Sequence, residues 1–213
     1  SDNIIPDIYL CCCGGGGLIA GSSTYLIQKF PKIKCYSIEP EEFNDTEISL
    51  EKKIIVSNSK KSYSICDALL APQPGEITFE INKKNLTSGF SVKDEEVKKT
   101  IINLAEHLKI IAEPGGAVAA SALLNNKIEV KNKTVIVIIS GGNIDNNLFS
   151  KISMALVTSS ICVSSKNTIP FLSPMAFNAK SMSTKIQSSV CEPSASRHAA
   201  QQVSQHAHSR ARL

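Results

Sequence analysis

The segment from Ile8 to Gly21, which reads IYLCCCGGGGLIAG, constrains the fold more than any other part of the sequence. Apolar and small residues of strand length lead into four glycines, and Gly, Ala, Leu and Ile follow. This order predicts a strand, a glycine loop and the start of a helix. Because glycine has no Cβ, Gly14 to Gly17 can bring successive backbone N–H groups close to a ligand, beside the positive end of the helix. Such a loop suits a phosphate group, although glycine runs also occur in flexible loops.

The sequence continues to residue 152 as an alternation of strands and helices. The predicted helices are Leu18–Phe30, Tyr63–Leu70, Asp94–Lys109 and Ala117–Leu124. The other predicted strands are Lys34–Ile38, Ile77–Ile81 at a sheet edge, Ile110–Ala112 and Thr134–Ile139. Residues 46–61 are polar and lysine-rich, which predicts surface. The alternation predicts an α/β domain over residues 1–152, with a largely parallel sheet flanked by helices.

The composition changes at about residue 153. Residues 1–152 carry 17 Lys against 18 Asp and Glu, a net charge of −1, whereas residues 153–213 carry three Lys, three Arg and one Glu, a net charge of +5. The basic excess therefore belongs to a Ser-rich tail, and no nucleic-acid partner is expected. The tail shows no periodicity, which predicts disorder over residues 153–213. The abrupt change in residue usage suggests that this tail is foreign to the domain or translated out of frame.

The bulk composition is that of a soluble protein, with 42% apolar and 20% charged residues. No apolar run reaches the length of a membrane span, and the first residues do not resemble a signal peptide. The seven cysteines include no C-x-x-C pair, and three of them lie in the apolar run before the glycines. We therefore expect reduced thiols, no zinc site, no membrane partner and a cytoplasmic location.

Three glycine turns, at Gly14, Gly115 and Gly141, each follow a predicted parallel strand. Ligands of such sheets bind outside the carboxyl ends of the strands, so the three turns are expected to lie together. The alternative is that these glycines only close tight turns.

Four motifs taken together resemble a known family. In order along the chain they are GGGGLIAG, ICDAL at Ile65–Leu69, EPGGA at Glu113–Ala117 and SGGN at Ser140–Asn143. Their order and spacing resemble the second half of the threonine/serine dehydratase and serine racemase family, pyridoxal-phosphate (PLP) enzymes of the tryptophan-synthase-β-like fold. The resemblance covers roughly residues 4–152.

The resemblance implies a PLP-dependent ammonia-lyase that converts a small hydroxy amino acid into ammonia and a 2-oxo acid, in a full-length enzyme that is a homo-oligomer. Serine racemase or hydroxyaspartate dehydratase activity of the same family remains an alternative. A further alternative is a non-catalytic module that binds a phosphorylated ligand or a partner subunit.

The resemblance also implies which residues bind the cofactor. The backbone amides of Gly14, Gly15, Gly16, Gly17 and Leu18 match the loop that holds the phosphate. Ser140 matches the hydroxyl that meets the pyridine nitrogen, and a neutral hydroxyl leaves that nitrogen largely unprotonated. Glu113 matches a carboxylate beside the ring, although it could equally be a helix N-terminal acid satisfied by nearby amides.

The acidic segment from Glu39 to Asp45 matches a divalent-cation site of serine-racemase-like members. The implied ligands of Mg²⁺ or Ca²⁺ are the Glu39 and Asp45 carboxylates and the backbone carbonyl of Phe43, all of them oxygen ligands that such cations prefer. The alternative is a solvated acidic loop. His107 has no partner in sequence and is expected to be a packed or surface histidine.

The sequence contains no match to the family's S-x-K-x-R-type segment, whose lysine forms the Schiff base with the cofactor. The serine that acts as acid and base, the asparagine that flanks the ring and the domain that grips the substrate carboxylate have no match either. We therefore predict no catalytic residue in this chain and expect it to be an inactive fragment when alone. Unpaired sheet edges of a fragment would also favour self-association.

Overall fold

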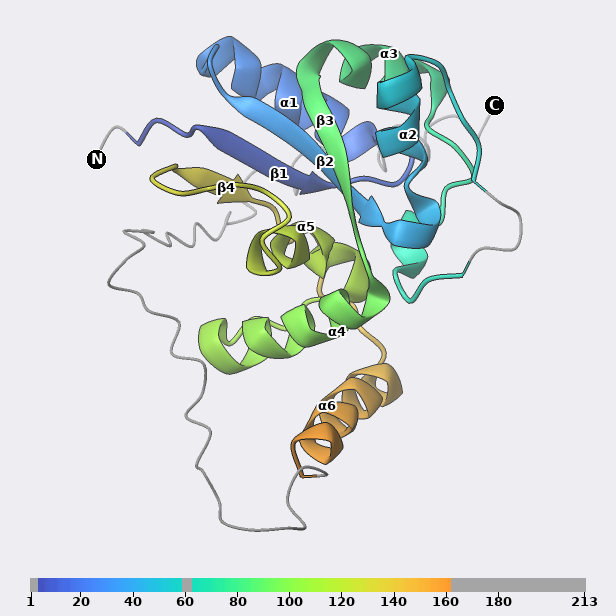
Figure 1. Cartoon of the computed structure of the whole chain (residues 1–213), viewed down its shortest axis with the longest axis vertical. Helices are drawn as coiled ribbons and strands as arrows, with labels where there is room; N and C mark the ends of the chain where they lie inside the picture. The colour runs from blue at the N-terminus through green and yellow to red at the C-terminus, as the bar shows by residue number, and fades with distance from the viewer. Residues whose placement is uncertain (1–3, 59–62, 162–213) are drawn as a thin grey trace, which may run out of the picture. The chain divides into compact units, whose positions relative to one another are not determined.

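The strand that leads into the glycine loop lies inside a four-stranded parallel sheet. β1 (Ile8–Cys12) pairs with β2 (Lys34–Pro40) on one side and with β4 (Val135–Val137) on the other, and β3 (Leu86–Val92) pairs with β2 (Figure 1). The strand order is therefore β3-β2-β1-β4. The computed structural model describes residues 4–58 and 63–161, the last six as backbone alone.

Helices cover both faces of the sheet, as the alternation of side chains along β1 requires. Tyr9, Cys11 and Cys13 face a core that includes Ile19 of α1 (Gly17–Lys29), and α3 (Glu76–Asn85) packs beside α1. On the same side, α2 (Asp45–Lys52) contacts β2 and β3 and adds Leu50 to this core.

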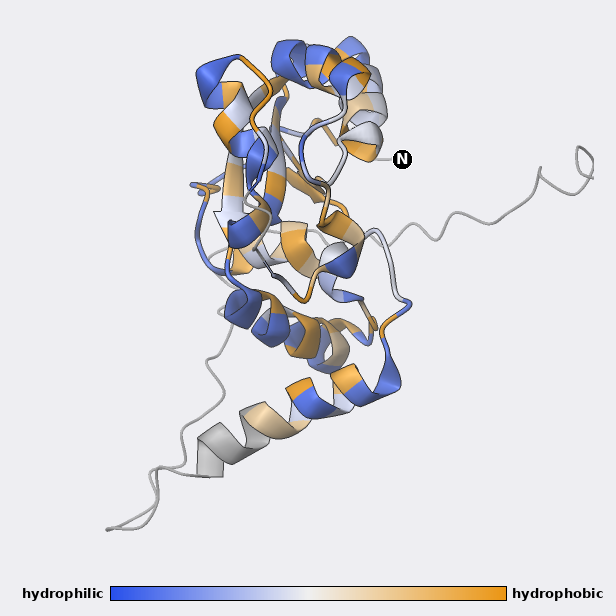
Figure 2. Cartoon of the chain, turned by 90° about the vertical axis from the view of Figure 1, so that its right-hand side faces the viewer, coloured by the Kyte–Doolittle hydropathy of each residue, from blue (hydrophilic) through white to orange (hydrophobic). Residues whose placement is uncertain are grey.

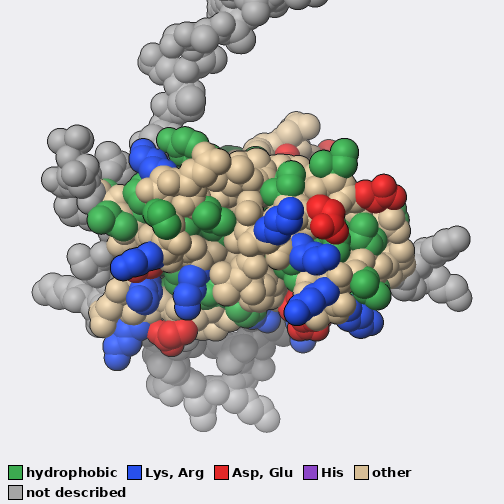
Figure 3. All heavy atoms as spheres, turned by 90° about the horizontal axis from the view of Figure 1, so that it is seen from above, with side chains coloured by type: hydrophobic (Ala, Val, Ile, Leu, Met, Phe, Trp, Pro, Cys, Tyr) green, Lys and Arg blue, Asp and Glu red, His purple; other side chains and the backbone are tan. Residues whose placement is uncertain are grey.

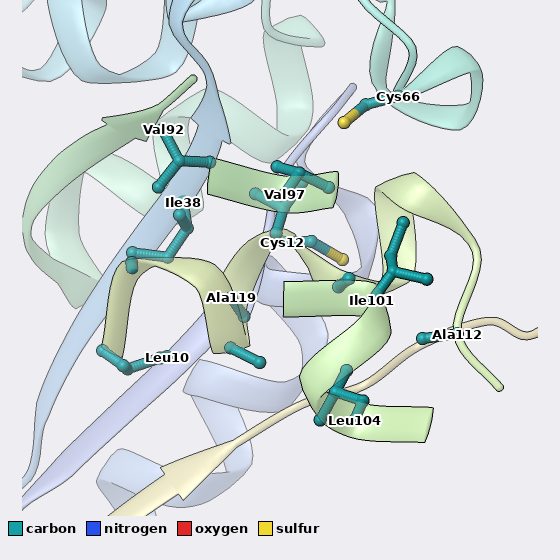
Figure 4. Packing of buried hydrophobic residues seen from close by; sticks show 14 of the residues in the cluster. Leu10, Cys12, Ile38, Cys66, Val92, Val97, Ile101, Leu104, Ala112 and Ala119 are labelled. Atoms are coloured by element: carbon teal, nitrogen blue, oxygen red, sulfur yellow. The ribbon is translucent and has the colours of Figure 1, made fainter. Parts of the chain in front are cut away.

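The opposite core forms where α4 (Asp94–Asn103) and α5 (Pro114–Leu124) pack together against the sheet. Figure 4 shows Leu10 and Ile38 of the sheet with Val97 and Ile101 of α4 and Ala119 of α5. Nine of the eleven residues of α5 are buried, and most of them are Gly, Ala or Ser. Small side chains of this kind allow a helix to approach a sheet closely. Accordingly, α5 shows little of the hydrophilic blue that marks the outer helices in Figure 2.

The predicted α/β class and parallel sheet are confirmed, as are most predicted elements. The helices predicted at Leu18–Phe30 and Ala117–Leu124 appear as α1 and α5. The strand predicted at Lys34–Ile38 is β2, and β4 occupies the centre of the predicted Thr134–Ile139 strand. The helix predicted at Asp94–Lys109 divides into α4 and a π-helical turn, Leu104–Leu108.

The edge strand predicted at Ile77–Ile81 is wrong, because these residues lie inside α3. Gly75 precedes this helix, Glu76 occupies its first turn and Lys83 and Lys84 its last, an arrangement that complements the helix dipole. β3 forms one edge of the sheet instead, and there tertiary packing overrides the weak strand propensity of Ser88 and Gly89. A Cβ on Gly89 would lie 2.8 Å from the Cα of Glu47, so α2 approaches β3 too closely for a larger residue.

Three other predictions need correction. Residues 46–61 are predicted to be surface, yet Thr46 and Ser49 of α2 are buried, and residues 59–62 lie outside the described part. The segment Tyr63–Leu70 forms only a 3-10 turn at Asp67–Leu69, and its start is instead bound to α4, where the Asp94 carboxylate accepts hydrogen bonds from the Ser64 hydroxyl and the Ile65 N–H. Ile110–Ala112 is not a strand: it pairs with none of the strands in the described part of the chain, and the next residue, Glu113, is already the N-cap position of α5.

A helix crosses the boundary predicted between residues 152 and 153. α6 spans Asn146–Ile161, so the first nine residues of the predicted tail are helical. The remainder of that tail, residues 162–213, lies outside the described residues, as do its predicted disorder and its suggested foreign origin.

The face of the molecule seen from above carries charges of both signs, with Lys side chains interspersed among Asp, Glu and hydrophobic side chains (Figure 3). In the described ranges, no helix combines the length and the apolar character needed to cross a membrane.

Burial of Ile38 between the sheet and α5 predicts a large cost for truncating it. Ile38 is fully buried, whereas Ile77 on α3 is 80% exposed. We expect Ile38→Ala to lower the free energy of unfolding by about 2 to 5 kcal/mol, because it leaves a cavity. The matched Ile77→Ala should change it by less than about 0.5 kcal/mol. Urea titration followed by circular dichroism measures both, and equal effects would contradict the described core.

Candidate cofactor site

The order of the strands places the predicted binding residues at one edge of the sheet. The chain passes from β1 to β2 to β3 in one direction and returns to the other side of β1 as β4. The crevice at such a switch point, outside the carboxyl ends of the strands, is where ligands of open α/β sheets bind. The glycine loop follows β1 and Ser140 follows β4, and the Cys12 Sγ lies 3.1 Å from the Ser140 Oγ. The loop and the hydroxyl therefore lie side by side at this edge of the sheet.

The glycine loop presents backbone N–H groups to open space. Gly16 caps the start of α1 with φ of 86°, a left-handed conformation that favours glycine. A Cβ added to Gly15 or Gly17 would meet nothing within 4 Å. Within the described residues, the N–H groups of residues 14–16 donate no hydrogen bond, and those of Gly17 and Leu18 belong to the unpaired first turn of α1. Free amides at a helix N-terminus suit an anion.

The four motifs found in the sequence contact one another through their glycines. A Cβ on Gly14 would lie 3.3 Å from the Leu69 Cα, and a Cβ on Gly115 would lie 3.3 Å from the Ala68 Cβ. ICDAL therefore lies between the glycine loop and EPGGA. A Cβ on Gly116 would lie only 2.5 Å from the Gly141 carbonyl oxygen, so EPGGA in turn packs directly on SGGN. These glycines close tight turns and also bring the motifs together.

Glu113 lies at the exit of β4, beside Ser140. Its backbone N–H donates to the Gly141 carbonyl at 3.0 Å, and its carboxylate accepts a hydrogen bond from the Asn143 N–H at 3.1 Å. Glu113 is also the N-cap residue of α5. The Glu113 carboxylate makes no hydrogen bond to the first turn of α5; it lies against Gly141, the residue after the predicted ring-binding Ser140.

The two carboxylates predicted to bind a cation are buried rather than part of a solvated loop. Glu39 is 0% exposed at the end of β2, and its carboxylate accepts hydrogen bonds from the N–H groups of Thr46 at 3.0 Å and Glu47 at 2.8 Å. Asp45 is 2% exposed; its Oδ1 accepts from the Asn58 amide, and its Oδ2 is buried without a hydrogen-bond partner. Phe43, in a 3-10 turn at Glu41–Phe43, lies between them in the chain.

Burial raises the pKa of both carboxyls, and the proximity of Asp45 raises that of Glu39 further. Burial, and secondly the charge of Asp45, raises the pKa of Glu39 to about 8, and burial raises the pKa of Asp45 to about 6. A cation that binds oxygen ligands would favour the ionised form of both carboxyls and so lower their pKa values. It could also bind the unpartnered Oδ2 of Asp45. No group of three or more His, Cys, Asp or Glu side chains in the described part of the chain is arranged to hold a metal. A site here would therefore need backbone or water oxygens besides the two carboxylates.

Three side chains at this edge were not identified from the sequence. Thr78 and Asn82 of α3 donate hydrogen bonds to carbonyls of the glycine loop, and Cys12 contacts Ser140. The first two were missed because their segment was predicted to be a strand; their spacing of four residues would have placed them on one face of a helix. Cys12 was treated only as a small core hydrophobe. His107 is exposed, as one of the two expectations for it stated.

Comparison with known proteins shows the family of this chain. A family model described as pyridoxal-phosphate dependent enzyme matches residues 3–141. The chain belongs to this family. It is 37% identical over 156 residues to the biosynthetic L-threonine dehydratase of Staphylococcus aureus, covering 71% of this chain and 36% of that protein. It is 35% identical over 135 residues to an L-threonine ammonia-lyase of Thermotoga maritima, covering 63% of this chain and 33% of that protein.

Solved structures give the same result for this PLP-enzyme family member. A serine racemase from Dictyostelium discoideum aligns with a TM-score of 0.60 and 34% identity, over 68% of this chain and 46% of that chain. The predicted resemblance to the threonine dehydratase and serine racemase group is therefore confirmed. The chain spans about a third of the length of the curated relatives named above.

The contact between EPGGA and SGGN predicts opposite effects for two glycine substitutions in helices. Gly116→Ala places a Cβ 2.5 Å from a backbone oxygen, so we expect it to destabilise the chain by about 1 to 3 kcal/mol. Gly21→Ala in α1 meets no atom within 4 Å and should stabilise the chain by about 0.4 to 1 kcal/mol. Urea unfolding measures both. A neutral or stabilising Gly116→Ala would show that the two motifs are not in contact.

Proposed function

We propose that this chain carries the phosphate-binding and ring-nitrogen-binding part of the PLP site of a threonine/serine ammonia-lyase. The observation that supports this most is the position of the free glycine-loop amides and the Ser140 hydroxyl beside adjacent parallel strand ends. The amides of Gly14 to Leu18 would hold the phosphate, and Glu113 would lie beside the ring. When bound, PLP supplies an electron sink for reactions of the amino-acid substrate.

Ser140 would set the protonation of the cofactor ring. A hydroxyl is neutral at physiological pH and donates one hydrogen bond, which leaves a pyridine nitrogen largely unprotonated. The Cys12 thiol at 3.1 Å can donate to the Ser140 oxygen and so leave the hydroxyl proton free to face the ring. The exposure of Ser140 gives a ligand access to it.

The reaction proposed is the release of ammonia and a 2-oxo acid from a small hydroxy amino acid. Two relatives named for threonine dehydratase and threonine ammonia-lyase activity support this choice. Serine racemase activity is the second candidate, supported by the aligned serine racemase structure, and hydroxyaspartate dehydratase activity remains an alternative. The full-length enzyme is proposed to be a cytoplasmic homo-oligomer.

The chain alone is proposed to bind the cofactor without catalysing the reaction. Its sequence has no S-x-K-x-R-type segment, and the residues that it aligns with make up about a third of each curated relative. A Schiff-base lysine would therefore come from residues outside this sequence. Because the sequence has no match to the lysine segment, a non-catalytic module that binds phosphorylated ligands remains an alternative.

A divalent cation, Mg²⁺ or Ca²⁺, is proposed at Glu39, Asp45 and the Phe43 carbonyl. The unpartnered Oδ2 of Asp45 and the closeness of two buried carboxylates fit such a cation. Bound there, it would stabilise the turn between β2 and α2, at the same edge of the sheet as the glycine loop.

Gly15→Asp tests the phosphate-binding loop. The new carboxylate would project into the open space beside Gly15 and repel a phosphate, so we expect pyridoxal phosphate to bind at least about ten-fold more weakly. Gly21→Asp adds the same charge to α1 outside the loop and should have little effect. Isothermal titration with the full chain measures each affinity. Equal affinities for the parent, Gly15→Asp and Gly21→Asp chains would show that the loop does not bind the phosphate. In a separate experiment, a pyridoxyl-lysine adduct after borohydride reduction would contradict the proposed inactivity of the chain alone.

Thermal unfolding with Mg²⁺ tests the cation site. In the folded chain, the pKa values of Glu39 and Asp45 lie above their values in the unfolded chain. The stability of the metal-free chain should therefore fall as pH rises from about 4.5 to about 8. The stabilisation by Mg²⁺, which needs ionised carboxylates, should grow over the same range. At pH 8 and about 100-fold above the dissociation constant we expect a rise in Tm of about 5 °C or more.

Asp45→Asn should lose this Mg²⁺ response, whereas Glu42→Gln, which neutralises an exposed acid of the same segment, should retain it. Identical responses in the two variants would show that the buried carboxylates bind no cation.

A further inference from the structure

The glycine loop is held from one side by helix α3. The Gly15 carbonyl accepts hydrogen bonds from the Thr78 hydroxyl at 2.6 Å and from the Gly75 N–H at 3.3 Å. The Gly16 carbonyl accepts one from the Asn82 amide at 3.4 Å, besides the Ala20 N–H at 3.0 Å. A Cβ on Gly16 would lie 2.7 Å from the Asn82 Nδ2 and 3.0 Å from the Thr78 Oγ1, so the contact leaves no space for a side chain.

These bonds fix the direction of the loop's N–H groups. In a trans peptide the C=O and the N–H of the same unit point in opposite directions. The Gly15 carbonyl shares its peptide with the Gly16 N–H, and the Gly16 carbonyl shares its peptide with the Gly17 N–H. With both carbonyls turned toward α3, both N–H groups point away from it. Neither of these N–H groups donates a hydrogen bond to the described part of the chain.

The Asn82 side chain lowers the stability of the fold. Its side chain is 0% exposed, and its Oδ1 is buried without a hydrogen-bond partner. A buried, unpaired amide oxygen destabilises a protein. The Gly16 carbonyl has a second donor in the Ala20 N–H, so it would stay satisfied if Asn82 were apolar. The stability of the fold therefore does not explain an amide at this position, whereas its hydrogen bond to the glycine loop does.

We propose that Thr78 and Asn82 are positioning residues that hold the Gly15 and Gly16 carbonyls so that the Gly16 and Gly17 N–H groups face the cofactor phosphate. This inference rests on the proposed PLP-binding function and adds to it two side chains outside the four motifs. Neither side chain needs to touch the cofactor, because both act through the backbone of the loop.

The test compares pyridoxal phosphate with pyridoxal, which lacks the phosphate, by titration of the full chain. Thr78→Val and Asn82→Leu remove the polar groups with little change of shape. We expect each to reduce the ratio of the two affinities about five-fold, the effect of one hydrogen bond of ordinary strength. Thr78→Ser keeps the hydroxyl and should keep the ratio of the parent chain.

Asn85 provides a matched control on the same helix. Its amide donates to the hydroxyls of Ser23 at 3.2 Å and Thr24 at 2.9 Å, so it joins α3 to the body of α1 rather than to the loop. Asn85→Leu should leave the affinity ratio within two-fold of the parent. We also expect Asn82→Leu to keep or raise the Tm, because it removes the unpaired oxygen. Weaker phosphate discrimination without lower stability cannot come from unfolding.

The outcomes separate this inference from the proposed function. An unchanged ratio in both Thr78→Val and Asn82→Leu, in a parent chain that favours the phosphate form and loses it with Gly15→Asp, would overturn the positioning role alone. A parent chain that binds both compounds equally would overturn the phosphate site and this inference together. If Asn82→Leu does not fold, the Thr78→Val and Thr78→Ser pair decides.

Discussion

The parallel pairing of β1 with both β2 and β4 is the interaction on which the rest of the structure depends. It places the exit of β1, with its glycine loop, beside the exit of β4, with Ser140, although the two segments are more than a hundred residues apart in the chain. Pairing of β1 with β2 alone would leave the loop without the hydroxyl. The position of the candidate site therefore results from strand order, and its chemistry results from the residues that follow each strand.

Glycine residues determine how closely the four motifs pack around the candidate site. At Gly14, Gly115, Gly116 and Gly141 a Cβ would contact another motif, whereas at Gly15 and Gly17 it would project into open space. The first group serves packing between motifs, and the second leaves backbone amides accessible to a ligand. The same residue type thus has two separate physical roles within one site.

Much of this arrangement could be predicted from the sequence, because it depends on local patterns. The apolar run before four glycines predicted β1 and α1, and the β-branched run at Thr134–Ile139 predicted β4. The ordered motifs predicted the family, which the comparisons confirm. The cofactor-binding and cation-binding roles of the named residues stay predictions.

The missed features depend on tertiary contacts that local patterns do not encode. Ile77, Phe79 and Ile81 alternate as in a strand, yet an acidic first turn, a basic last turn and packing on α1 favour a helix here. Ser88 and Gly89 have weak strand propensity, yet they lie inside β3 because β2 pairs with them and α2 packs against Gly89. The burial of Glu39 and Asp45 follows from α2, a helix that was not predicted.

The glycine-loop amides and Ser140 are proposed to bind the two ends of one cofactor molecule, and a crystal structure of the chain with pyridoxal phosphate would test this proposal. We expect phosphate oxygens within about 2.7 to 3.2 Å of the N–H groups of Gly15 to Gly17, with the ring nitrogen at hydrogen-bond distance from the Ser140 Oγ. A phosphate bound elsewhere on the chain, or a ring turned away from Ser140, would contradict it.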